Sequence, residues 1–320
     1  MSTEPQTLME AIKHFADPDV ALATMVDLRW PNGVTCPDCG RTDVRFIATR
    51  RIWECKSSHV RKQFTAKRGT IFEDSPLGLD KWFTAIWMIA NCKNGVSSYE
   101  VHRAIGVTQK SAWFMLHRIR LAMETGSFLQ GGPGTSEADE TFIGGLAKNM
   151  HKYKRKAKIT GRGASGKEVV MGVLRRGADG EASRVTARHV PDTSKDTLHA
   201  EVRRAVAPGS RLYTDAHAGY TGLGPDYIHE TVDHAVEYVR GAVSTNGMEN
   251  FWSLFKRAIK GTYVSIEPFH LDAYVVEETF RFNERGDNDG GRFHKVLASV
   301  AGKRITYKEL IGHDQGTPLA

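Results

Sequence analysis

Cysteine is scarce in this chain of 320 residues, which holds only four, at positions 36, 39, 55 and 92. So few cysteines exclude the dense disulfide framework of small secreted proteins. The longest strongly apolar run, around WFTAIWMIA, is too short to span a bilayer. The N-terminal MSTEPQTLMEAIKHF also lacks the basic, then apolar, then small-residue order of a secretory signal. We therefore expect a soluble, cytoplasmic protein with no membrane partner.

Acidic residues are outnumbered, with 37 Asp and Glu against 44 Lys and Arg, so the net charge is +7. A basic excess of this size suits a nucleic-acid partner but does not require one. The stretch KNMHKYKRKAK, residues 148–158, holds six basic residues and no acid. Lys154 and Arg155 are its candidate phosphate contacts, while an ordinary solvated loop is the alternative.

The first three cysteines have the spacing of a metal site. TCPDCG places Cys36 and Cys39 two residues apart, which is the usual first half of a zinc ribbon. Cys55 and His59 in WECKSSH complete a Cys3His set, although His59 as an exposed loop residue beside some other fourth ligand is the alternative. Cys92 lies in an apolar helical context, so we expect it to be a small core residue.

A helix-turn-helix pattern follows in GVSSYEVHRAIGVTQKSAWFMLHRIRLAM. The pattern predicts a helix from Ser98 to about Ala104, a turn around Gly106, and a second helix with Thr108 as its N-cap. Core contacts are predicted at every third or fourth position of the second helix. Four polar residues of that helix are then free to meet DNA: Gln109, Lys110, Arg118 and Arg120. Any short helical hairpin with a glycine would look alike.

The second half of the chain alternates strand and helix patterns after the flexible GGPGTSEADE junction. The order is three strands, a helix, a strand, a short helix, a strand and a last helix. This is the order of the RNase H-like fold, an α/β fold with a mixed five-stranded sheet. It brings together the middle of the first strand, the end of the fourth and the start of the last helix, which carry Asp139, Asp215 and Glu249.

These three carboxylates have the chemistry of a magnesium site. Mg²⁺ prefers carboxylate and water ligands, and two such ions stabilise both the attacking and the leaving oxygen of a phosphodiester. Glu140 is excluded because strand alternation sends it to the opposite face from Asp139. For Glu249 a purely structural reading competes, in which NGMENFW opens a helix with Asn246 as N-cap and Glu249 at the third helical position. Glu249 and Lys256 share one face of that helix.

Taken in order, several stretches resemble the DDE transposases of bacterial insertion sequences that carry an N-terminal zinc ribbon. They include TCPDCG, ADETFIGG, YTDAHAGY, NGMENFWSLFKRAIKGTYVSI and RFNERGD, within about residues 30–287. The resemblance implies that Asp139, Asp215 and Glu249 bind catalytic Mg²⁺ or Mn²⁺, and that Lys256 contacts the DNA end. It also implies terminal inverted repeats and target DNA as partners, and a homo-oligomer on that DNA.

The same reading divides the chain into five regions. They are a helical leader, a zinc ribbon, a helix-turn-helix-like region, the RNase H-like catalytic domain and a tail, over 1–30, 31–68, 69–130, 131–290 and 291–320. Two other functions remain open at this point. One is a nuclease of the same fold that only hydrolyses nucleic acid. The other is a zinc-ribbon and helix-turn-helix DNA-binding regulator whose nuclease-like half is inactive.

Overall fold

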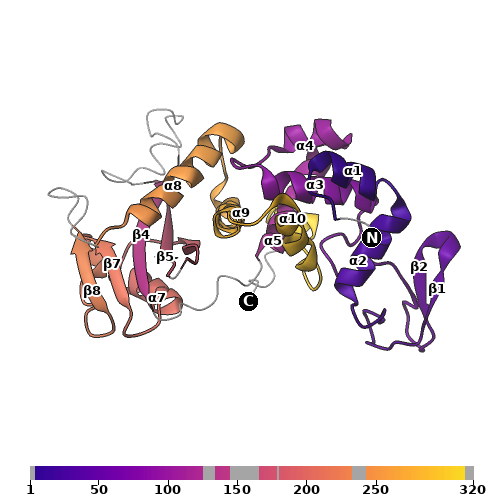
Figure 1. Ribbon diagram of the computed structural model, residues 1–320, viewed down its shortest axis with the longest axis horizontal. Coiled ribbons are helices and arrows are strands. Elements are labelled where there is room, and N and C mark those ends of the chain that lie inside the picture. The colour runs from indigo at the N-terminus through magenta and orange to yellow at the C-terminus, as the bar shows by residue number, and fades with distance from the viewer. Residues whose placement is uncertain (1–3, 125–133, 145–165, 179, 233–242, 314–320) are drawn as a thin grey trace. The chain divides into compact units, whose positions relative to one another are not determined.

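The computed structural model describes residues 4–124, 134–144, 166–178, 180–232 and 243–313 (Figure 1). These residues form two compact units. Unit 1 is drawn from Met1–Cys92, Val96–Thr125 and Asp287–Ala320, and unit 2 from Lys93–Gly95 and Gly126–Gly286. Within the described ranges, every helix is too short or too polar to cross a membrane.

Unit 1 combines helices with a small antiparallel sheet in the order β1-β2-β3. Its strands are β1 (Val44–Ile47), β2 (Ile52–Cys55) and β3 (Gln63–Phe64). Its helices are α1 (Leu8–Phe15), α2 (Pro18–Arg29), α3 (Leu79–Asn91), α4 (Ser98–Ile105), α5 (Gln109–Met123), α10 (Asp289–Ala298) and α11 (Tyr307–Leu310). A 3-10 turn, Ala48–Arg50, joins β1 to β2.

The core of unit 1 forms around α3, which is apolar on most of its surface. Phe293 of α10 packs its ring against Phe83 and Trp87 of α3, with centroids 5.8 and 5.3 Å apart. Phe15 of α1 lies 4.9 Å from Phe83 in an edge-on contact. Helix α10 therefore belongs to the same core as α1, although 278 positions separate Phe293 from Phe15.

The predicted helical pair is confirmed in α4 and α5. Gly106 ends α4 in the left-handed conformation at φ 62°, and the Thr108 side chain accepts a hydrogen bond from the Ser111 backbone N–H at the start of α5. Beyond its first two turns, however, α5 is buried on all sides, from Met115 to Arg120. A helix buried all round lies inside a core. Cys92, predicted in the core, is instead exposed at the end of α3.

Unit 2 is built on a five-stranded sheet in the order β6-β5-β4-β7-β8. Its elements are β4 (Thr135–Ile143), β5 (Glu168–Arg175), β6 (Arg184–Val190), α7 (Lys195–Ala205), β7 (Arg211–Asp215), β8 (Ile228–Val232), α8 (Asn246–Ala258) and α9 (Leu271–Asn283). β4 is antiparallel to β5 and parallel to β7, and β7 is parallel to β8. Three short turns, Ala218–Tyr220, Ile259–Tyr263 and Pro268–His270, complete the unit. The predicted order of elements and the mixed RNase H-like sheet are confirmed.

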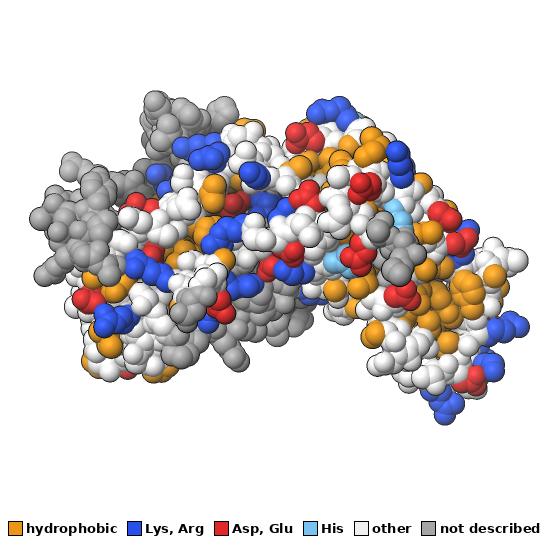
Figure 2. Space-filling view, in the orientation of Figure 1, with side chains coloured by type: hydrophobic (Ala, Val, Ile, Leu, Met, Phe, Trp, Pro, Cys, Tyr) orange, Lys and Arg blue, Asp and Glu red, His pale blue; other side chains and the backbone are white. Residues whose placement is uncertain are grey.

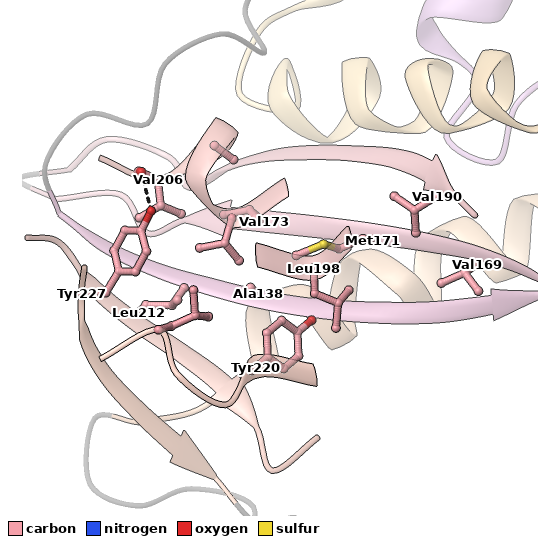
Figure 3. Close-up of a cluster of buried hydrophobic side chains, with 13 residues drawn as sticks. Ala138, Val169, Met171, Val173, Val190, Leu198, Val206, Leu212, Tyr220 and Tyr227 are labelled. Atoms are coloured by element: carbon pink, nitrogen blue, oxygen red, sulfur yellow. Dashed lines mark hydrogen bonds between the residues drawn. The ribbon is translucent and has the colours of Figure 1, made fainter. Parts of the chain in front are cut away.

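Two apolar clusters cover the two faces of this sheet. On one face, Ala138, Met171 and Leu212 pack against Leu198 of α7 and Tyr220 (Figure 3). On the other, a second cluster joins the sheet to α8 and α9: Ile143, Val170, Leu174, Val185, Met248, Phe251, Trp252, Phe255, Leu271, Val275 and Phe282. Successive residues of β4 therefore alternate between the α7 side and the α8 side.

Candidate metal sites

Three cysteines and one histidine gather in the small sheet of unit 1. Ligand atoms of Cys36, Cys39, Cys55 and His59 all lie within 4.8 Å of one another. The Cys39 and Cys55 sulfurs are 3.6 Å apart, and the Cys36 sulfur lies 3.5 Å from Nε2 of His59. Tetrahedral zinc with Zn–S bonds of about 2.3 Å would hold sulfurs about 3.8 Å apart. The spacing and the donor set therefore fit a structural Zn²⁺ ion.

The second nitrogen of His59 faces an acidic partner. Nδ1 of His59 lies 3.8 Å from a carboxylate oxygen of Asp38, whose other oxygen is bound by Arg68 at 2.7 Å. Partners of this kind fix the ring orientation and tautomer of a metal-bound histidine. The structure thus brings together the four predicted zinc ligands, including His59 with Nε2 toward the sulfurs.

In unit 2, Asp139 and Asp215 lie side by side on the two central parallel strands. The register pairs Glu137 with Tyr213, and each aspartate follows two residues later on its own strand. Both side chains therefore point to the same face, which α8 covers. Burial, followed by the charges of Glu140 and Asp215, raises the pKa of Asp139 to about 7. Two carboxylates that repel each other in a partly dry setting are a candidate cation site.

Glu140 lies on the α7 face, as alternation predicts. Its carboxylate accepts a 2.7 Å hydrogen bond from the Tyr220 hydroxyl. Burial raises the pKa of Glu140, and the charge of Asp215 adds to the effect. Asp215 itself accepts a 3.0 Å hydrogen bond from the backbone N–H of His217, which fixes the carboxylate at the end of β7.

The third predicted carboxylate, Glu249, is exposed on α8. The competing interpretation, in which Asn246 and Glu249 form a capping box, does not agree with the structure. The helix begins at Asn246, with Thr245 as the N-cap residue and no side-chain cap, so Glu249 is the fourth helical residue. Its backbone N–H already bonds to the carbonyl of Thr245, 3.0 Å away. The capping box predicted from NGME is therefore wrong. Asp139, Asp215 and Glu249 do not form a set as tight as the zinc ligands, which in the described ranges are the one such group.

The start of α8 is instead held by a residue that the sequence did not indicate. Glu137 on β4 is buried, accepts the Met248 backbone N–H at 3.0 Å and pairs with Arg176 at 2.7 Å. Arg176 in turn donates to the carbonyl and hydroxyl of Ser244. A Cβ on Gly247 would lie 2.8 Å from the Glu137 carboxylate, so a larger residue there would displace this carboxylate. This network fixes the entry of α8 onto the sheet.

Lys256 lies further along the same face of α8. Burial lowers the pKa of its amine, and the nearby charge of Asp139 acts in the opposite direction. Because Asp139 appears among the charges that act on Lys256, the amine and this carboxylate lie within electrostatic range. Asp139, Asp215 and Lys256 thus share the α8 side of the sheet.

Two predicted DNA contacts are structural residues instead. The Arg118 guanidinium is buried and donates to the backbone carbonyls of Ile71, Glu73 and Ile305. Arg120 is 1% exposed. Their predicted freedom to meet DNA is wrong, because α5 is a core helix and not an amphipathic one at these positions.

The remaining predicted contacts differ in accessibility. Gln109 is half-buried and donates to the Ser98 hydroxyl at 2.8 Å, whereas Lys110 is exposed, with its amine 4.5 Å from the ring centre of Tyr307. Lys154 and Arg155 lie outside the described residues. Figure 2 shows basic and acidic side chains interspersed on the face in view.

The fold and the sites together define a class: an RNase H-like domain with paired aspartates on its central strands, accompanied by a zinc ribbon. Comparisons with known families agree. Residues 129–283 match the family described as ISXO2-like transposase domain, and residues 17–59 match the transposase zinc-ribbon domain. The chain therefore carries the transposase domain and the zinc-ribbon domain of insertion-sequence DDE transposases.

A relative from Halobacterium salinarum is described as an uncharacterized protein in transposable element ISH50. It is 28% identical to this chain over 261 residues, which cover 78% of this chain and 85% of the relative.

Proposed function

We propose that this transposase binds the terminal inverted repeats of its element and catalyses metal-dependent DNA cleavage and strand transfer. The observation that carries the proposal is the pair Asp139 and Asp215, side by side on β4 and β7 under α8. In this proposal both aspartates and Glu249 bind divalent cations. Mg²⁺ or Mn²⁺, when bound, would neutralise charge on the attacking and leaving phosphate oxygens.

The surrounding residues support this assignment. Carboxylates whose charges repel each other at the end of central strands gain most when a cation occupies the site. Glu249 is exposed on α8, the helix that lies over the strand carrying Asp139. Helix α8 is held over β4 by the hydrogen bonds from Met248 to Glu137 and from Trp252 to Asp139, so in this proposal Glu249 supplies the third carboxylate from the helix.

Positively charged residues would hold the DNA. Lys256, near Asp139, is suited to contact the phosphate beside the reacting bond, and the exposed Lys110 at the start of α5 to contact the repeat. Gln109 would contribute only if its bond to Ser98 opens. Lys154 and Arg155 remain further proposed phosphate contacts. Two element ends must be paired for transposition, so we also propose a homo-oligomer on double-stranded DNA in the cytoplasm.

The experiment uses a supercoiled plasmid that carries this gene with its native flanks. Purified protein is added in Mg²⁺ or in Ca²⁺, and every new 3′ end and every joined product is mapped. Nicks at matching repeats and joined products in Mg²⁺ are expected for wild type. Both should fall at least about a thousandfold for Asp215→Asn and Glu249→Gln.

A matched control is Asp226→Asn, which removes a carboxylate of the same unit that pairs with Arg203 at the surface. This control should retain activity. Cleavage without joining would identify a purely hydrolytic nuclease. Repeat binding without cleavage, in wild type and Asp215→Asn alike, would identify an inactive DNA-binding regulator and overturn the proposal.

A further inference from the structure

Trp252 connects α8 directly to Asp139. Its indole N–H donates a 3.0 Å hydrogen bond to Oδ2 of Asp139, and the side chain is only 4% exposed. The N–H of a buried tryptophan usually finds a hydrogen-bond partner. Here the acceptor is a carboxylate that the proposed function makes a cation ligand.

The sheet provides a slot for this indole. In the β4–β5 register, Gly172 lies directly opposite Asp139. A Cβ on Gly172 would lie 3.0 Å from two ring atoms of Trp252 and 2.5 Å from the terminal methyl of Met248. Glycine at this position therefore lets the ring lie flat on the strand and reach the carboxylate beside it.

The position of Trp252 on the helix completes the arrangement. Glu249 precedes it by three residues and Lys256 follows it by four, so the three side chains share one helical face. The hydrogen bond from Trp252 to Asp139 therefore fixes the part of α8 that lies against β4. The other proposed functional groups lie one turn to either side.

We propose that Trp252 is a positioning residue for cation binding: it holds Oδ2 of Asp139 so that Oδ1 is presented to a divalent cation. This inference rests on the proposed function, which makes Asp139 a ligand. Hydrogen-bond partners of metal ligands commonly contribute about 10–100-fold in metal affinity. The carboxylate in a Trp252 variant would rotate and lose this preference.

The test measures Mn²⁺ binding directly, by the decrease of the free Mn²⁺ signal in electron paramagnetic resonance. Full-length protein with its zinc in place is used, without DNA. Trp252→Phe keeps an aromatic ring in the Gly172 slot and removes only the N–H donor. We expect its Mn²⁺ dissociation constant to rise about tenfold or more.

A matched packing control is Phe282→Leu, which removes a ring contact with Phe251 in the same apolar cluster. It should bind Mn²⁺ within about twofold of wild type. Gly172→Ala provides an independent variant, because its new methyl group displaces the indole without removing it, and it should also weaken binding. Near-ultraviolet circular dichroism checks that each variant is folded, and Gly172→Ala decides the matter if Trp252→Phe is not.

Asp139→Asn separates the two proposals. If it abolishes Mn²⁺ binding while a folded Trp252→Phe, or Gly172→Ala in its place, binds as tightly as wild type, Trp252 only packs the core and the inference is overturned. If Asp139→Asn binds Mn²⁺ like wild type, the cation site proposed above is itself misplaced. Loss in Asp139→Asn with the expected weakening in Trp252→Phe supports both.

Discussion

The two metal sites of this protein differ in what holds them together. The zinc ligands of unit 1 lie within 23 positions of sequence and come from loops and the end of a short strand. The carboxylates of unit 2 span 110 positions, on two strands and a helix. We therefore expect the zinc ligands to be held together by the metal ion, and the carboxylates of unit 2 to be held together by the packing of the sheet and its helices.

Packing explains the difference. The small sheet consists of strands of four, four and two residues, and the buried residues in and beside it are few: Cys36, Ile52, Trp53, Cys55 and Phe64. A core of that size cannot fold a segment without a metal or another cross-link. The large sheet carries an apolar cluster on each face, so its aspartates can be held next to each other despite their repulsion. We therefore expect the zinc to be structural, and we expect the proposed divalent cation to bind a fold that forms without it.

Removal of zinc gives the largest expected effect and the sharpest test of this difference. A chelator, or Cys36→Ser, should unfold the segment around β1 to β3, because structural zinc contributes about 10 kcal/mol or more to such folds. Amide hydrogen exchange should become fast in this segment and stay slow in β4 and β5. Cys92→Ser is the matched control, since Cys92 lies away from the cluster. Fast exchange throughout unit 2 as well would contradict the view that unit 2 folds independently of the zinc site.

Truncation of Glu137 tests the other side of the comparison. Glu137→Ala removes the buried carboxylate that pairs with Arg176 and accepts the Met248 backbone N–H. We expect the free energy of unfolding of unit 2 to fall by about 3 kcal/mol, measured by urea denaturation. Glu230→Ala, which removes an exposed carboxylate 4.0 Å from Arg211, should cost under about 0.5 kcal/mol. Equal costs would mean that this network does not hold α8.

The sequence predicted those features that depend on local pattern. Cys-x2-Cys spacing identified half of the zinc site, and the strand and helix periodicities of unit 2 predicted the order of the large sheet. That order in turn predicted that Asp139 and Asp215 lie on neighbouring strands, and each follows by two residues the Glu137–Tyr213 pair of the β4–β7 register. The roles of Asp139, Asp215 and Glu249 in catalysis remain predictions.

What the sequence could not predict depends on tertiary contacts. Arg118 and Arg120 are polar by composition, yet the backbone carbonyls that bind Arg118 come from segments 45 to 187 positions away. In the sequence Glu137 cannot be distinguished from other strand residues. Its role depends on its tertiary contacts with Met248 and Arg176. Asn246 was a plausible N-cap, but this distant carboxylate already satisfies a helix N–H, so the helix needs no local cap.

The pH dependence of cation binding is the smallest of the expected effects. It tests whether the proposed cation competes with a proton on Asp139. Its pKa of about 7 lies above the usual value of 3.8, so the folded unit retains a proton that the unfolded chain releases. The metal-free unit therefore loses stability as the pH rises from about 4 to 7, and a cation reverses that loss. Since Mn²⁺ must displace the proton, its apparent affinity should fall about tenfold from pH 8 to pH 6. Calorimetry in buffers of different ionisation enthalpy should detect the released proton near pH 6. Affinity that does not change with pH would show that Asp139 is already ionised in the fold, and that the sheet holds its aspartates at less electrostatic cost than their burial implies.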